Sequence, residues 1–193
     1  LRNMMLFPGV VGSVAVNRTM SLKVVNQSLK KGSLIAVLAQ KNAHVDEPER
    51  KDFYDEGVVA RVMRTIDLPN PMGGKSCMAI LQTYGPLKLE KITRRKPTMR
   101  VEVSPIEEVI YDKDDEQFKA VADACRDGMV NFLQLNDGPR SEEATFAVNN
   151  ISHPVFLVNF ICSNMQLTQD DRYKLFQIHD VRERAMHLLQ IIN

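Results

Sequence analysis

The segment Val58–Leu68 reads VVARVMRTIDL, and its pattern decides how the first half of the chain folds. Even-numbered positions in it are mostly apolar, and odd-numbered positions are mostly polar. Successive side chains of a β-strand point to opposite faces of a sheet, so this alternation predicts a half-buried strand whose even-numbered residues face the core. Residues 87–90 and 98–103 alternate in the same way. The run 34–39 is apolar throughout and is expected to be a central strand.

One helix is expected among these strands, from about Thr19 to Lys31. Thr19 or Ser21 can cap its first turn, and Gly32 readily takes the left-handed conformation in which many helices end. Up to about Tyr111, the sequence therefore predicts a sheet or barrel with one inserted helix.

After Tyr111 the apolar residues recur every three or four positions, as in amphipathic helices. The first predicted helix carries the apolar stripe Phe118, Val121, Ala122, Cys125, Met129, Phe132 and Leu133. Further helices are expected near 141–148 and 155–165, and from Thr168 and Asp180 onward. The last one, with the stripe Val181, Ala185, Leu188 and Ile192, has no C-cap before Asn193 and is expected to be the start of a longer helix.

Composition narrows the class of protein. The 193 residues hold 25 Lys and Arg against 24 Asp and Glu, so the net charge favours neither nucleic acid nor an anionic membrane. No apolar run approaches the roughly 20 residues of a membrane span, and no signal peptide is visible in a chain that begins with Leu1. Cys77, Cys125 and Cys162 are odd in number and widely spaced, as in a cytoplasmic protein with reduced thiols.

The segment 70–76 reads NPMGGKS and ends like a phosphate-binding loop. That motif is G-x-x-x-x-G-K-[ST], but its first glycine position is occupied by Pro69, which has no N–H to donate. The apolar run after Ser76 ends at Gly85–Pro86, which leaves little room for the helix that must follow such a loop. A hairpin loop between two strands is therefore the better interpretation.

No metal site or catalytic nucleophile is predicted. Residues 112–116 read DKDDE, but the sixth position of a calcium loop should be Gly and is Gln117, so these acids are assigned to the first turn of a helix. The four histidines lack the spacing of zinc ligands. No Gly-x-Ser-x-Gly elbow occurs. The densest basic stretch contains Lys88, Lys91, Arg94, Arg95, Lys96 and Arg100, without an aromatic residue among them to stack on bases, and is interpreted as a solvated face.

Several segments, taken in order, resemble the N-terminal domain of the Lon family of ATP-dependent proteases. LFPG at 6–9 and VAVNRTMS at 14–21 are similar to the family opening of a strand, FPG, a second strand and G-R-x-x-S. AQK at 39–41, followed by Asp46 and Pro48, resembles the family's AQK…D-P segment. FYDEGVVARV at 53–62 is similar to D-L-Y-x-x-G-T-V-A-R-I. FLVNFI at 156–161 and DVRER at 180–184 resemble the later helices more loosely.

The resemblance implies an α+β fold: a PUA-like β pseudo-barrel with one inserted helix over residues 1–111, then a helical bundle over 112–193. It also implies that the family's ATPase module, which uses ATP and magnesium, and its Ser-Lys protease dyad lie downstream of this chain. The fragment itself is then expected to have no catalytic residue, cofactor or metal.

The function implied is recognition of unfolded, damaged or tagged polypeptides for the downstream ATPase and protease ring, and assistance in assembling that homo-hexamer. Candidate contacts to polypeptide are Met4, Met5, Met72, Tyr84 and Leu87, near the expected junction of barrel and bundle. Two alternatives stay open. One is a nucleic-acid-binding PUA-like module that uses the basic stretch near Arg94, and the other is a free-standing Lon-type adaptor domain.

Overall fold

The structure is a computed structural model that describes residues 1–69, 73–135 and 139–192. It divides the chain into two compact units, Leu1–Ile106 and Glu107–Asn193. The observed division, after Ile106, lies a few residues before the one expected after Tyr111. Among the described residues, the five strands belong to the first unit and the second contains helices, so the fold mixes sheet and helix as the change in periodicity indicates.

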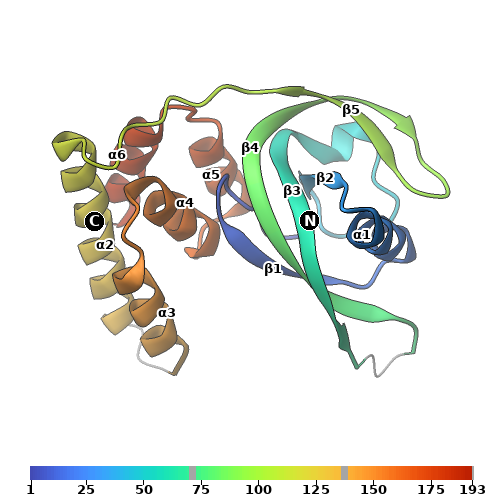
Figure 1. Ribbon diagram of the computed structural model, residues 1–193, viewed down its shortest axis with the longest axis horizontal. Coiled ribbons are helices and arrows are strands. Elements are labelled where there is room, and N and C mark those ends of the chain that lie inside the picture. The colour runs from blue at the N-terminus through green and yellow to red at the C-terminus, as the bar shows by residue number, and fades with distance from the viewer. Residues whose placement is uncertain (70–72, 136–138, 193) are drawn as a thin grey trace. The chain divides into compact units, whose positions relative to one another are not determined.

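The first unit is built on an open antiparallel sheet in the order β1-β4-β3-β2, with β5 also paired to β4. Figure 1 shows β3 and β4 as two long, curved strands that run side by side. The strands are β1 (Val11–Val16), β2 (Leu34–Gln40), β3 (Phe53–Leu68), β4 (Ser76–Arg94) and β5 (Arg100–Pro105). Among the described strands β2 pairs only with β3, so the sheet is not closed into the expected barrel.

β2 was expected to be a central strand, but it lies at the edge of the sheet. Its apolar character has another cause, because the helix α1 (Thr19–Lys31) packs against β2, β3 and β4. The bounds of α1 agree with the prediction. It ends at Gly32, whose φ of 65° is left-handed, but its N-cap is Arg18, which makes no side-chain capping bond.

The segment NPMGGKS belongs to a hairpin, as predicted. Leu68, the last residue of β3, pairs with Ser76, the first residue of β4. Ser76 therefore begins a strand where a phosphate-binding loop needs a helix. Residues 70–72 of the connection lie outside the described residues.

Gly85–Pro86 was expected to end a strand, but β4 continues through it to Arg94. Val58 pairs with Pro86 and Ala60 with Thr83, so β4 has one more residue than β3 between these pairs. Such a β-bulge accommodates a proline without breaking the sheet, because the bulge already interrupts the regular hydrogen bonds.

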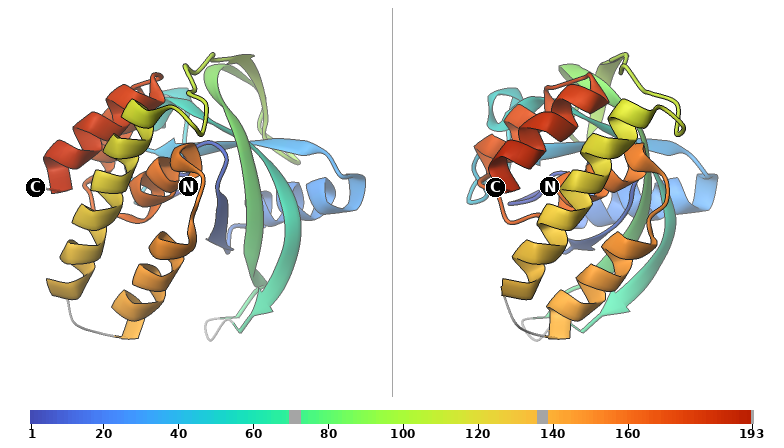
Figure 2. Two further views of the ribbon diagram at one scale, coloured as in Figure 1. Left: turned by 60° about the vertical axis from the view of Figure 1, so that its left-hand side comes forward. Right: turned by 90° about the vertical axis from the view of Figure 1, so that its left-hand side faces the viewer.

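The second unit contains α2 (Glu116–Leu135), α3 (Pro139–Asn150), α4 (Pro154–Asn164), α5 (Gln169–Phe176) and α6 (Val181–Ile192). Three of these helices are capped by side chains at their N-termini. Asp115, Thr168 and Asp180 accept hydrogen bonds from backbone N–H groups in the first turns of α2, α5 and α6. Of the acids at 112–116, Asp115 caps α2 and Glu116 is its first residue, whereas Asp112 and Asp114 precede the helix. Figure 2 shows α2 as the longest helix, with α6 beside it.

The prediction of a helical bundle is wrong. The helices that follow α2 are too short and too unequal in length to run side by side along it. They have 12, 11, 8 and 12 residues. The core of this unit is formed by α2, α4, α5 and α6, whereas Val148 is the only buried residue among the described side chains of α3. The proposal that α6 begins a longer helix is not tested, since Asn193 lies outside the described residues.

Gly57 allows β2 and β3 to approach each other closely. A methyl group at this position would lie 2.4 Å from the carbonyl oxygen of Val37, a contact that only a shift of the backbone could relieve. We expect Gly57→Ala to lower the free energy of unfolding by roughly 1–3 kcal/mol, as other overpacked sites do. Urea unfolding of the chain measures it.

Gly85→Ala is the matched control, because a methyl group at Gly85 would have no heavy atom within 4 Å. Its effect is expected to be within about 0.5 kcal/mol. Equal destabilisation by the two variants would contradict the steric explanation.

Candidate functional site

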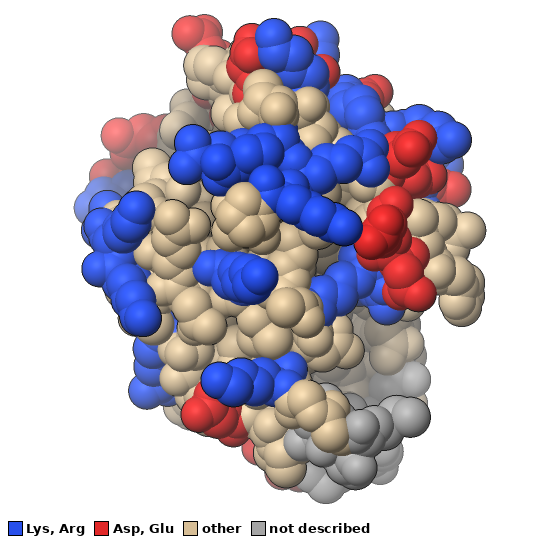
Figure 3. Space-filling view, turned by 90° about the vertical axis from the view of Figure 1, so that its right-hand side faces the viewer, with Lys and Arg blue, Asp and Glu red and all other residues tan. Residues whose placement is uncertain are grey.

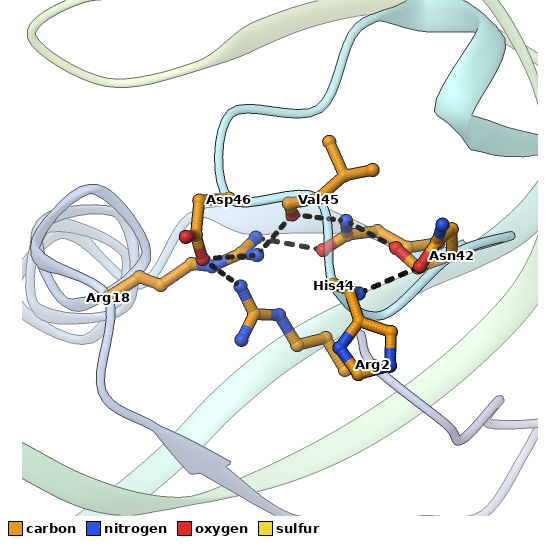
Figure 4. Close-up of polar contacts among 7 residues, drawn as sticks. Arg2, Arg18, Asn42, His44, Val45 and Asp46 are labelled. Carbon is orange, nitrogen blue, oxygen red and sulfur yellow. Dashed lines mark hydrogen bonds and ion pairs between the residues drawn. The ribbon is translucent and has the colours of Figure 1, made fainter.

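The sequence motifs near the N-terminus meet in space around the side chain of Arg18. Its guanidinium donates to the side-chain oxygen of Gln40 at 2.8 Å and to the carbonyl oxygen of Val45 at 2.6 Å. Asp46 accepts from Arg2 at 2.7 Å and lies 3.8 Å from Arg18. Figure 4 shows both guanidinium groups pointing toward the Asp46 carboxylate.

These contacts fix the loop after β2, since Gln40 also donates to the carbonyl oxygens of Asn42 and Val45. Buried polar groups are favourable only when they are hydrogen-bonded, and here the terminal nitrogens of Arg18 and the amide of Gln40 bond to each other and to the backbone of one loop. The cluster has no nucleophile and no pair of groups suited to acid–base chemistry. It is an anchor for the loop.

The opening motif LFPG is anchored in a similar way by Thr83, a buried residue of β4. The Thr83 hydroxyl accepts from the N–H of Val10 at 2.8 Å and donates to the carbonyl oxygen of Phe7 at 2.7 Å. Gly9 between them has a φ of 73°, a left-handed conformation that glycine adopts at little cost. The motif is thus a turn held against the sheet.

The cysteines are unsuited to nucleophilic catalysis. All three are buried. Burial raises the pKa of the Cys125 and Cys162 thiols to about 12, so both are protonated at neutral pH. Within the described ranges, no three His, Cys, Asp or Glu side chains are placed to hold a metal ion.

The second unit contains a buried ion pair. Arg184 is fully buried and donates to Glu108 at 2.7 Å and to Asn159 at 2.7 Å. Its Nε donates to the carbonyl oxygen of Leu175 at 3.2 Å. Residue 109 is bonded to the same region, because the N–H of Val109 donates to His179 and its carbonyl accepts from Val181. These contacts hold the segment after Ile106 against the start of α6.

A more promising surface is one face of the sheet, which we call the outer face. Residues paired across β1, β4 and β3 form rows that run across the sheet. Three of these rows lie on the outer face: Val11–Gln82–Arg61, Ser13–Ile80–Arg64 and Ala15–Met78–Ile66. The rows between them contain Leu81, Val62, Val14 and Ala79, which are buried in the core. Exposed apolar side chains on the outer face and beside it are Val11 (52%), Met63 (55%), Ile66 (46%) and Tyr84 (42%).

A β-bulge creates this arrangement. Val62 pairs with Leu81 and Arg64 with Ile80, so Met63 is an extra residue in β3. One extra residue shifts the alternation, and every later side chain of the strand changes face. The expectation that even-numbered residues face the core is therefore correct for Val58, Ala60 and Val62, and wrong for Arg64 and Ile66, which are exposed.

The predicted contact residues that the structure describes do not share one surface. Met5 and Leu87 belong to the core, with 2% and 1% of their surface exposed. Met4 is half-buried, and Tyr84 lies on β4 two residues beyond Gln82 of the outer face. Met72 lies outside the described residues. Val11, Met63 and Ile66 were missed, although the pair Met63–Arg64, where the alternation of VVARVMRTIDL breaks, was a signal of the bulge.

The first unit also has a basic face, which Figure 3 shows. Lys23, Lys30 and Lys31 of α1 line an open groove together with Pro97 and Thr98. The basic stretch predicted from sequence is partly neutralised, since Lys91 pairs with Glu102 at 3.0 Å and Arg95 with Glu49 at 4.0 Å. The lysines of α1 were missed because they are distant in sequence from that stretch.

Comparison with known proteins decides the family. A family model described as the ATP-dependent protease La (LON) substrate-binding domain matches residues 1–193. The chain belongs to this family. It is 31% identical to a Lon protease of Flavobacterium johnsoniae over 193 residues, and 32% identical to one of Parabacteroides distasonis over 194 residues. In each case the match covers 100% of this chain and 23% of the relative's length.

Solved structures of Lon N-terminal domains have the same fold. The N-terminal domain of a Mycobacterium avium complex Lon protease matches with a TM-score of 0.68 and 19% identity, over 100% of this chain and 94% of that one. A Lon N-terminal domain protein of Xanthomonas campestris matches with a TM-score of 0.63 and 16% identity, over 98% and 95%. The Lon resemblance drawn from the motifs is therefore confirmed, and the structure shows that LFPG and the Arg18 segment act as anchors.

The buried pair gives a test of the second unit. Glu108→Gln keeps the size of the side chain but removes the charge that compensates Arg184, which is fully buried. We expect it to lower the free energy of unfolding by about 3 kcal/mol, since a buried charge without its partner is costly. Chemical denaturation followed by circular dichroism is the measurement.

Glu107→Gln is the matched control, because Glu107 is the neighbouring residue and is exposed. Its effect should stay within about 0.5 kcal/mol. If Glu108→Gln changed the free energy of unfolding as little as this control, the charge of Glu108 would not be needed to stabilise the buried Arg184.

Proposed function

We propose that this Lon substrate-binding domain captures unfolded, damaged or tagged polypeptides through its outer face. The observation that supports this most directly is the exposure of Val11, Met63, Ile66 and Tyr84 on or beside one face of a sheet. Sheets of folded domains usually place such side chains against another layer, and an exposed apolar surface of this kind is characteristic of a binding site.

The chemistry suits weak binding to many sequences. Burying an apolar side chain of this size contributes about 1.5–3 kcal/mol, so a few contacts are enough to hold an extended segment. Methionine adapts its shape to different partners because its side chain is unbranched and flexible; Met78 lies on the outer face, and Met63 is the exposed extra residue beside it.

The activity of the whole protein is a proposal as well, because the chain spans about a quarter of the length of the Lon proteases that it matches. We propose that captured segments pass to ATPase and Ser-Lys protease domains that use ATP and magnesium, in a homo-hexameric cytoplasmic assembly that this domain helps to form. No helix within the described part of the chain is long and apolar enough to cross a membrane.

The test combines Met63→Ser with Ile66→Ser. Both side chains are about half exposed, so the fold should tolerate the change while the outer face loses apolar area. We expect the affinity for a reduced, carboxymethylated model protein to fall at least about tenfold, since each truncated side chain gives up roughly 1 kcal/mol of apolar burial. Fluorescence anisotropy with a labelled substrate measures this.

Val103→Ser is the matched control, an exposed apolar residue of β5 outside the outer face. It should leave binding unchanged. Equal reductions in affinity for the control and the double variant, or no binding by the unaltered chain, would rule out the outer face as the capture site.

Nucleic-acid binding is a second candidate, supported by the basic groove along α1. Lys23, Lys30 and Lys31 lie on the groove, and Lys88, Lys96 and Arg100 of the same unit have no ion-pair partner among the described residues. Lysines and arginines that are not paired with acids suit a phosphate backbone, which binds by releasing counterions. That the β-rich unit is PUA-like stays a prediction.

Salt dependence distinguishes this candidate. If it is correct, Lys30→Gln with Lys31→Gln should weaken binding of a DNA duplex and lower the slope of log K against log salt concentration by about 2, because each lysine that no longer neutralises a phosphate lowers it by about 1. Lys119→Gln, an exposed residue of α2, is the control. Affinity that does not change with salt would exclude the basic groove as a nucleic-acid site.

A further inference from the structure

The outer face carries charge as well as apolar surface. Arg61 and Arg64 are three positions apart, so in a regular strand they would point to opposite faces. The bulge at Met63 places both on the outer face, where Arg61 pairs with Gln82 and Arg64 with Ile80. Both arginines are exposed.

Neither guanidinium is neutralised. The side chains of Arg61 and Arg64 make no hydrogen bond or ion pair with any described residue. The three rows of the outer face contain no Asp or Glu, and the nearest acid in β3, Asp67, pairs with Cys77 in a row of the opposite face. The outer face therefore combines apolar side chains with two unpaired positive charges.

From this combination we infer that the outer face selects unfolded segments in which acidic and apolar residues alternate. The inference rests on the proposed capture of polypeptide by the same face. A guanidinium that meets a carboxylate forms a charge-assisted hydrogen bond, which is roughly twice as strong as a neutral one. A lysine at the same place would be repelled by the arginines.

The strand register also predicts how the acidic and apolar residues of the bound segment are spaced. Gln82, Ile80 and Met78 mark three successive rows, and residues two apart in a strand are separated by about 6.6 Å. An extended ligand presents every second side chain to the face. Two acids separated by one residue can therefore meet Arg61 and Arg64, and an apolar residue two positions further on meets the row of Met78 and Ile66.

The experiment uses three labelled peptides with the same flanks and the cores Asp-Thr-Asp-Thr-Leu, Asn-Thr-Asn-Thr-Leu and Lys-Thr-Lys-Thr-Leu. We expect the acidic peptide to bind the full chain at least about fivefold more tightly than the amide peptide, and the lysine peptide to bind least. The preference should shrink when the salt concentration rises from about 50 to about 500 mM, because exposed charges are screened.

Arg61→Gln with Arg64→Gln should abolish the preference, so that the acidic and the amide peptide bind with equal affinity. Arg100→Gln, an exposed arginine of β5, is the control and should keep the preference. If all three peptides bind equally, the acidic selectivity is wrong while capture by the face stands. If none binds to the unaltered chain, the proposed capture fails and the selectivity fails with it.

Discussion

The antiparallel pairing of β3 with β4 supports the rest of the β-rich unit. Every other strand pairs with one of these two: β2 with β3, and β1 and β5 with β4. Because side chains alternate along a strand, the β3–β4 register decides which residues of the neighbouring strands face the core. Both strands are long enough to need adjustments, and two bulges supply them, one opposite Gly85–Pro86 and one at Met63.

The bulge at Met63 links this architecture to the proposed function. Before it, β3 turns Val58, Ala60 and Val62 inward, and after it the strand turns Arg64 and Ile66 outward. Bulges commonly redirect side chains in this way near functional sites. The same extra residue thus exposes apolar surface and brings two arginines together, which is the combination that a surface for partly acidic, unfolded segments needs.

The family motifs have a different role. Arg18, Gln40 and Asp46 hold one loop, Thr83 holds the LFPG turn, and Arg184 with Glu108 holds the segment after Ile106. Their polar groups bond mainly to backbone carbonyls or to one another, which leaves little capacity for a ligand. These anchoring residues are therefore separate from those proposed to bind substrate, whereas Arg61 belongs both to the motif FYDEGVVARV and to the outer face.

The sequence by itself determined the two periodicities, the bounds of α1, the capped starts of the helices in the second unit and the hairpin at NPMGGKS, because these depend on local patterns and on the chemistry of Gly, Pro and capping residues. Of the four predicted contacts that the structure describes, only Tyr84 is exposed beside the outer face. The break in alternation at Met63–Arg64 marks the bulge in the sequence, but which strand lies at the edge and which arginines share a face were decided by strand pairing. Pairing joins residues far apart in the chain, and no local pattern contains that information.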